Sequence, residues 1–141
     1  LGAIDGVAIR IRRPLSSDSG LFGRVDNPAL YFNRKGFYSV NMQAVVDRRG
    51  RFLNVSIVTP GSTCDSVAHL ASPLGQYLEP EKAKLPLGYF LVGDAAYASS
   101  NQMITPYPGR GLAVSKDSIS ISLRCESMWY LLFLSILLRN I

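Results

Sequence analysis

Four segments of the chain arrange apolar and polar residues in patterns that predict β-strands. Residues 3–11 and 87–92 are short, mainly apolar runs, which are typical of strands buried in a sheet. Between residues 37 and 46, apolar side chains occupy the even positions 38 to 44, and polar side chains occupy the odd positions between them. This alternation predicts a half-buried strand, and residues 52–58 repeat it on a returning strand.

The segments between these strands carry turn signals. Asp47-Arg48-Arg49-Gly50 predicts a hairpin turn in which Asp47 is a turn residue and Gly50 adopts a positive φ. Residues 33–36 form a second, basic turn. Residues 12–28 are rich in Pro, Ser and Gly and are predicted to be a loop.

A helix is predicted between the third and fourth strands. Ser62, Thr63 and Asp65 are all suitable N-cap residues. Apolar residues then recur at helical spacing up to residue 78. Pro73 interrupts this pattern, which leaves two alternatives, namely two short helices or one kinked helix.

The predicted order of strand, strand, strand, helix and strand defines an α/β fold. Three strands in an antiparallel meander are followed by a crossover, and right-handed crossovers return the chain parallel to an earlier strand. If the strand at residues 87–92 lies beside the strand at residues 3–11, Asp5 and Asp94 become neighbours.

Both of these acids require a chemical explanation. Asp5 lies inside an apolar strand, and Asp94 follows Gly93 at the end of another. A buried carboxylate is costly unless it is paired, hydrogen-bonded or bound to a metal. Two alternatives remain open, namely that Asp5 pairs with an arginine and that Asp94 accepts backbone N–H groups in a turn.

Composition limits the classes of protein that fit. The chain has 141 residues, of which 48% are hydrophobic and 18% charged, as expected for one globular domain. Two cysteines are too few for a disulfide framework or a zinc site, which favours a reducing compartment. The first residue is Leu, which suggests a fragment, and no signal segment opens the chain.

Positive charge is concentrated in the first half of the chain. Between Arg10 and Arg51 there are nine basic and three acidic residues, a net charge of +6 compared with +5 for the whole chain. A basic stretch near buried acids favours a polyanionic substrate. The alternative is a solvated positive surface without a binding role.

Five short motifs occur in one order along residues 1–107. They are AIDG at 3–6, NRKGFYS at 33–39, PGS at 60–62 followed by DS at 65–66, GD at 93–94 with Tyr97, and TPY at 105–107. The series resembles the DDE superfamily endonuclease domain of PIF/Harbinger transposases and of the nucleases derived from them. This resemblance implies an RNase H-like mixed sheet with flanking helices, metal-dependent cutting of DNA, and location in the nucleus, with the cytoplasm as a further compartment.

The resemblance also implies site residues. Asp5 corresponds to the first catalytic acid, Asp94 to a second catalytic acid, and Asp5, Asp65 and Asp94 to metal-site positions. Oxygen ligands of this kind select Mg²⁺ or Mn²⁺. For Asp65 the alternative is a helix N-cap. Arg34 and Lys35 are either DNA-binding residues that contact phosphate or ordinary turn residues.

The pattern departs from the family after Tyr107. Residues 108–141 are expected to form a divergent tail with an apolar helix at 128–138, too short for the roughly 20 residues of a membrane span. Glu126 is the single acid within range of the closing position, in an altered setting. The fold and the active site are therefore expected to be incomplete at the C-terminus.

These observations leave three readings. The first is a metal-dependent endonuclease domain that acts on DNA with an incomplete site. The second is a non-catalytic, domesticated transposase module that binds DNA or a protein partner, and the third is a gene product without a stable role. Recognition of the DNA target is expected to require an N-terminal part or a separate DNA-binding partner protein, and no membrane association is expected.

Overall fold

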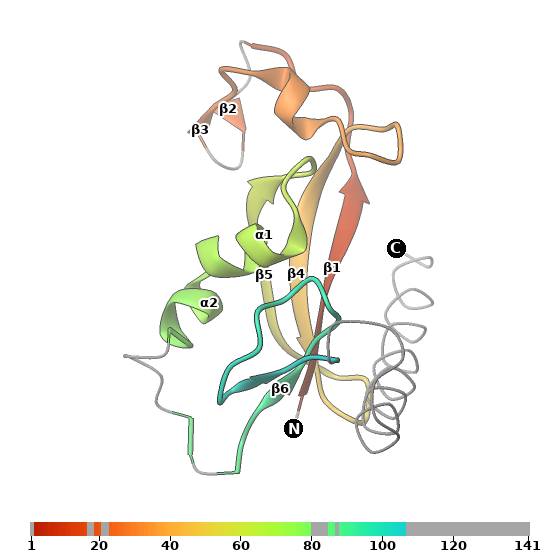
Figure 1. Cartoon of the computed structure of the whole chain (residues 1–141). Helices are drawn as coiled ribbons and strands as arrows, with labels where there is room; N and C mark the ends of the chain where they lie inside the picture. The colour runs from red at the N-terminus through yellow and green to blue at the C-terminus, as the bar shows by residue number, and fades with distance from the viewer. Residues whose placement is uncertain (1, 17–18, 21–22, 80–84, 87, 107–141) are drawn as a thin grey trace.

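The computed structural model describes residues 2–16, 19–20, 23–79, 85–86 and 88–106 (Figure 1). The predictions for Tyr107, Glu126 and the tail at 108–141 lie outside these residues. The main element is a mixed five-stranded sheet in the order β5-β4-β1-β6-β7. Its strands are β1 (Gly2–Arg10), β4 (Ser39–Val46), β5 (Phe52–Pro60), β6 (Leu91–Val92) and β7 (Met103–Ile104).

The first three strands of this sheet form the predicted antiparallel meander. β4 pairs with β1 on one side and with β5 on the other. The hairpin between β4 and β5 depends on Asp47, whose carboxylate accepts the backbone N–H groups of Arg49 at 2.8 Å and Arg51 at 3.0 Å. Gly50 has a φ of 75°, which confirms the predicted turn.

The crossover returns the chain beside β1, as the sequence predicts. β6 pairs with β1 in parallel, with Gly2 opposite Leu91 and Ala3 opposite Val92. The predicted strand at 87–92 is too long, because β6 contains only Leu91 and Val92. β7, which pairs in parallel with β6, was not predicted.

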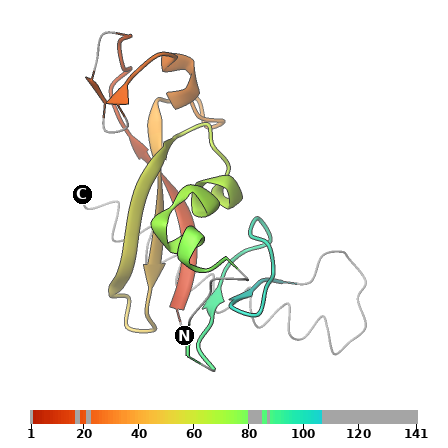
Figure 2. The ribbon, with the colours of Figure 1, turned by 90° about the vertical axis from the view of Figure 1, so that its left-hand side faces the viewer.

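Two short helices, α1 (Asp65–Ala71) and α2 (Pro73–Tyr77), cover one face of the sheet (Figure 2). Pro73 begins the second helix, which confirms the alternative of two pieces. The Ser72 hydroxyl caps that helix by accepting the Gly75 N–H at 3.0 Å. No helix in the described ranges is long and apolar enough to cross a membrane.

The segment predicted as loop between the first two long strands contains small elements of its own. They are β2 (Ser19–Gly20), β3 (Gly23–Arg24) and the 3₁₀ helix η1 (Pro28–Tyr31). β2 and β3 pair only with each other and form a separate two-stranded sheet. Such short elements carry no periodic signal that a sequence pattern could reveal.

The sheet has a buried cluster on each face. One contains Ile4, Val45, Leu91 and Tyr97 with Leu78 from the turn after α2. The other contains Ala3, Met42, Ala44 and Val46. The prediction that β4 is half-buried is wrong, because its polar residues Asn41 and Gln43 are 7% and 3% exposed. They lie beneath α1, where Asn41 donates to the Asp65 carboxylate and Gln43 accepts from the Tyr97 hydroxyl.

β5 shows the opposite deviation, with apolar side chains in solvent. It is the outermost strand of the described sheet on its side. Phe52, Leu53 and Val55 are 38%, 59% and 48% exposed. We call these three side chains the β5 apolar edge.

Candidate functional site

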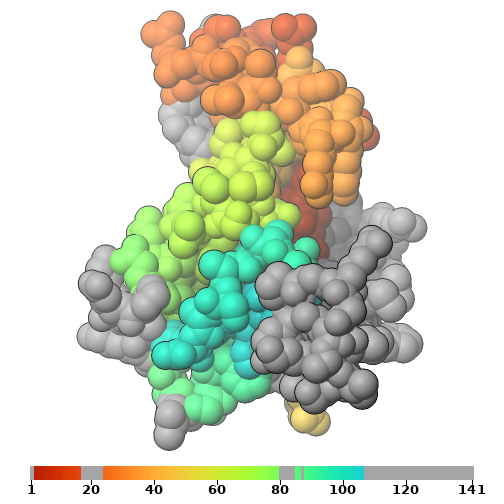
Figure 3. Space-filling view, in the orientation of Figure 1, coloured from red at the N-terminus to blue at the C-terminus, as the bar shows by residue number. Residues whose placement is uncertain are grey.

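A polar cavity of about 340 Å³ lies where four distant segments of the chain meet. Asp65 and Asp94 line one part of it, and Asn33, Arg34 and Lys35 line another. Gly6 of β1 lines it as well. In Figure 3 the red atoms of β1 are seen in a hollow between the orange, yellow-green and teal segments.

The basic turn that borders the cavity is held by Asn33. This side chain is buried, its Oδ1 accepts the Lys35 N–H at 2.9 Å, and its Nδ2 donates to Ser39 Oγ at 2.7 Å. Gly36 completes the turn with a φ of 82°. The predicted basic turn is confirmed, and both Arg34 and Lys35 are exposed at the cavity.

The loop from β5 to α1 forms the adjacent wall. The Gly61 N–H donates to the Ser39 carbonyl at 2.8 Å. A Cβ at residue 61 would overlap Ser39 Oγ, so glycine is required for this close approach. Ser39 thus joins the basic turn to the loop that leads to Asp65.

Asp65 is the first residue of α1, and the N-cap position belongs to Cys64. The alternative role of Asp65 as the N-cap is therefore wrong. Its Oδ1 instead accepts hydrogen bonds from Asn41 Nδ2 at 3.0 Å and Gln43 Nε2 at 3.3 Å. A Cβ at Gly6 would overlap this same oxygen, so the carboxylate rests directly on the backbone of β1.

Asp94 follows the end of β6. Because Ala3 pairs with Val92, Asp5 and Asp94 each lie two residues beyond a paired position of the neighbouring strands β1 and β6. Asp94 Oδ1 accepts the Ala96 N–H at 2.9 Å, as the turn alternative predicted. Because Asp94 also lines the polar cavity, the turn role and a role in the site are compatible.

Asp5 lies behind this cavity. On β4 the partner of Asp5 is Ala44, and the partner of Gly6 is Gln43. The Asp65 carboxylate lies over Gly6. Since successive strand residues point to opposite faces, Asp5 and Asp65 lie on different faces of β1. Asp5 is not one of the described residues that line the cavity.

The charges of the other two acids nevertheless affect the pKa of Asp5. The pKa of Asp5 is raised to about 7, first by burial and further by the negative charges of Asp65 and Asp94. A hydrogen bond from the Gly6 backbone and the charge of Lys35 act in the opposite direction. Within the described ranges the ion pairs join Arg24 to Asp26 and Arg51 to Asp47, so the alternative of an Asp5–arginine pair has no support there.

The donor atoms fit a hard divalent cation in their chemistry. Carboxylate oxygens and a nearby amide-rich surface suit Mg²⁺ or Mn²⁺. The described part of the chain contains no group of three or more His, Cys, Asp or Glu residues arranged to hold a metal ion. Two carboxylates, those of Asp65 and Asp94, line the cavity, and the third, that of Asp5, lies on the other face of β1.

Asn41, Gln43 and Tyr97 contribute to the site through their hydrogen bonds, and no sequence pattern predicts a functional role for the first two. The alternating pattern placed Asn41 and Gln43 on a solvent face. The available signal was their residue type, since two amides at alternate positions of a strand differ from the charged residues usual on exposed faces. In the sequence, Tyr97 stands out only as part of the motif that contains Gly93 and Asp94.

The chain matches the family described as DDE superfamily endonuclease over residues 4–126. Because the match spans most of its 141 residues, the chain belongs to this family. The matched region extends beyond Tyr107 and ends at Glu126. Comparisons with curated proteins and with solved structures gave no match. Family membership indicates a nuclease-type domain of transposase origin.

Proposed function

We propose that this chain is an RNase H-like endonuclease domain of the PIF/Harbinger type that acts on DNA phosphodiester bonds. The observation that carries the proposal is that two carboxylates and two basic side chains, from segments far apart in the sequence, border one polar cavity. The order β5-β4-β1-β6-β7, with an antiparallel meander followed by parallel strands, supports the RNase H-like assignment.

We assign the roles of the residues from the family resemblance together with their positions. Asp65 and Asp94, with Asp5 behind them, would hold Mg²⁺ or Mn²⁺, and Asp5 and Asp94 are the proposed catalytic acids. Such ions activate a water molecule and stabilise the leaving oxygen. Arg34 and Lys35 attract the phosphate backbone to the same cavity without reading its sequence.

The cellular setting follows from this role. A DNA-cutting domain of this type acts in the nucleus, with the cytoplasm as a second compartment. A separate DNA-binding partner protein, or another part of the protein, would select the target. A second candidate function is a non-catalytic module that binds DNA, and the absence of a ready-made group of three metal ligands among the described residues favours it.

Manganese binding and plasmid nicking test the proposal together. We expect the chain to bind Mn²⁺, measured as loss of the free-ion signal in electron paramagnetic resonance, and to nick supercoiled plasmid slowly, with EDTA abolishing cleavage. Asp94→Asn should abolish both, because it removes a charged ligand from a small set. Asp26→Asn is the matched control, since Asp26 is exposed and pairs only with Arg24 among the described ion pairs.

The possible outcomes separate the two candidate functions. Equal Mn²⁺ binding by the parent, Asp94→Asn and Asp26→Asn would overturn the proposed site. Binding that depends on Asp94, without nicking, would support the non-catalytic module. Nicking that Glu126→Gln also abolishes would assign the closing acid to Glu126.

A further inference from the structure

A chain of buried hydrogen bonds leads from Tyr97 to Asp65. The Tyr97 hydroxyl donates to Gln43 Oε1 at 2.8 Å. Gln43 Nε2 donates to Asn41 Oδ1 at 2.8 Å and to Asp65 Oδ1 at 3.3 Å. Tyr97, Gln43 and Asn41 are 4%, 3% and 7% exposed, so water does not readily substitute for these partners.

The direction of this chain is determined at its far end. Asn41 Nδ2 donates to the Thr63 carbonyl at 3.0 Å, and a carbonyl can only accept. The Asn41 amide is therefore oriented with its Oδ1 toward Gln43, which must present Nε2 to it. Gln43 Oε1 then faces Tyr97, where a donor is needed, and the hydroxyl provides one.

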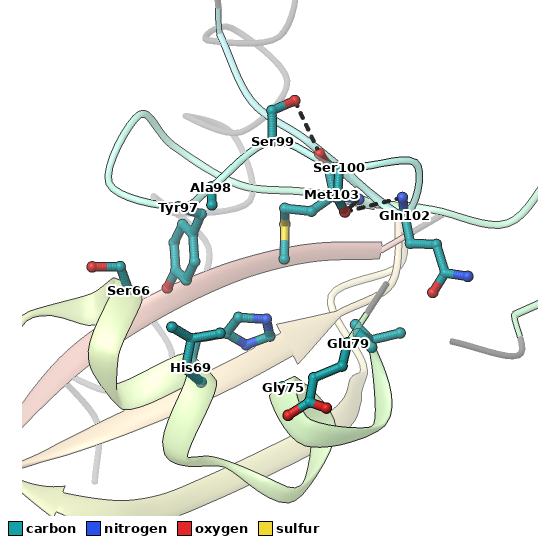
Figure 4. A pocket seen from close by; sticks show the side chains of 12 residues that line it. Ser66, His69, Gly75, Glu79, Tyr97, Ala98, Ser99, Ser100, Gln102 and Met103 are labelled. Carbon is teal, nitrogen blue, oxygen red and sulfur yellow. Dashed lines mark hydrogen bonds between the residues drawn. The ribbon is translucent and has the colours of Figure 1, made fainter. Parts of the chain in front are cut away.

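Tyr97 is held in place by packing that does not involve its hydroxyl. Its ring meets the His69 ring edge-on, with centroids 5.7 Å apart. A Cβ at Gly93 would come within 2.8 Å of a Tyr97 ring carbon. Figure 4 shows Tyr97 between α1, which carries Ser66 and His69, and the segment from Ala98 to Met103, at a second cavity of about 180 Å³.

The electrostatic surroundings keep the phenol in its donor form. Burial, followed by the negative charges of Asp5, Asp65 and Asp94, raises the pKa of Tyr97 above its usual value. The hydroxyl consequently remains protonated throughout the physiological range. Deprotonation would place one more negative charge beside the carboxylates.

We propose that Tyr97 and Gln43 are positioning residues, in which the Tyr97 hydroxyl holds the Gln43 amide in the orientation that presents its N–H groups to Asn41 and Asp65. The inference deepens the proposed function, because Asp65 is one of the acids assigned to the cation. Without the hydroxyl, Gln43 Oε1 is left as a buried acceptor that has lost its donor, so the amide is held less firmly in the orientation that presents its N–H groups to Asn41 and Asp65. In the reversed orientation, Oε1 faces Asn41 Oδ1 and the Asp65 carboxylate, which repels that oxygen.

The test begins with the metal-free chain, so that it does not depend on catalysis. The side-chain amide resonances of Gln43 in a ¹H–¹⁵N spectrum report its orientation and protection from exchange. We expect one protected pair of signals in the parent, and broadened or doubled signals in Tyr97→Phe. Tyr89→Phe is the matched control, since Tyr89 is 60% exposed, and it should leave the Gln43 signals unchanged.

The same variants are then titrated with Mn²⁺. Tyr97→Phe should weaken binding by about tenfold, a typical loss when a group that orients a ligand is removed. Gln43→Met should weaken binding by at least as much. The double variant should bind like Gln43→Met alone, because Tyr97 acts through Gln43.

Melting temperatures show whether each variant folds. If Tyr97→Phe does not fold, the Mn²⁺ affinity of Gln43→Met decides the outcome. Unchanged Gln43 signals and parent-like Mn²⁺ affinity in a folded Tyr97→Phe chain would overturn the inference. Additive losses in the double variant would also overturn it. If the parent itself binds no Mn²⁺, the proposed function fails, while the Gln43 signals still decide whether Tyr97 orients the amide.

Discussion

Asp5 is the acid whose protonation is most affected by its surroundings. It lies on β1 between Ile4, which is buried, and Gly6, on which the Asp65 carboxylate rests. Burial and the neighbouring charges of Asp65 and Asp94 raise its pKa to about 7. A cation close to the three acids would reverse this effect, since positive charge favours the ionised carboxylate.

The raised pKa of Asp5 predicts how stability varies with pH in the metal-free protein. In the unfolded chain an aspartate titrates near pH 4, so the folded state holds this proton more tightly between pH 4 and about 7. The stabilisation is fully present below pH 4 and is lost as the pH rises to about 7. Relative to Asp5→Asn, the parent should lose up to about 4 kcal/mol of unfolding free energy over this interval.

Urea unfolding at a series of pH values measures this loss. Asp26→Asn serves as the control, because it removes an exposed acid and should follow the parent. Parallel curves for the parent and Asp5→Asn would contradict the assignment of the raised pKa to Asp5.

At the scale of single residues, the sequence predicted the acids better than the groups that hold them. Asp5 and Asp94 could be selected because an acid inside or after an apolar run is unusual. Asn41 and Gln43 could not, since an alternating strand looks the same whether its polar face meets water or a buried carboxylate. Gly6 is similar, because its requirement comes from Asp65, which lies 59 positions later in the sequence.

Among the elements, the basic turn has the clearest separable role. Its backbone is fixed by Asn33 and Ser39, so Arg34 and Lys35 can be replaced without disturbing the anchoring hydrogen bonds. We expect the double variant Arg34→Glu, Lys35→Glu to bind DNA more weakly. The slope of the logarithm of the binding constant against the logarithm of the salt concentration should become shallower by about 2, because each lost phosphate contact changes it by about 0.9.

The control for this experiment is a second pair of exposed basic residues. Arg48 and Arg49 lie in the hairpin at the opposite end of β4, and Arg48→Glu with Arg49→Glu changes the net charge equally. Fluorescence anisotropy on a short duplex between about 50 and 200 mM salt gives both slopes. Equal slopes for the two variants would show that net charge, rather than the turn, attracts DNA.

The long elements were predictable and the short ones were not. β1, β4 and β5 contain eight or nine residues each, which is long enough to show an apolar pattern in the sequence. Pro73 indicated the break between the two helices. β6 and β7 contain two residues each, so their pairing depends on partners elsewhere in the chain. The burial of β4 also depends on a partner, because α1 covers its polar face.

For the whole molecule, the site is a product of topology. The polar cavity joins residues near positions 6, 34, 62 and 94, and their convergence requires the crossover that places β6 beside β1. The order of predicted elements was sufficient to anticipate that β6, which precedes Asp94, would lie beside β1, which contains Asp5. It was not sufficient to anticipate that Asp5 would lie on the face of β1 opposite Asp65, because the face depends on single-residue register.

The β5 apolar edge affects how this protein behaves at high concentration. Residues 52–59 include no charge and no proline and are rich in β-branched and aromatic side chains, a composition that favours intermolecular strand addition. Arg51 and Pro60 flank this window as gatekeepers. We expect Leu53→Lys to raise the protein concentration at which light scattering begins, whereas Leu30→Lys, at a side chain 49% exposed in η1, should not. Equal effects of the two substitutions would assign self-association to general surface hydrophobicity, while the expected difference would make one outer strand the determinant of solubility.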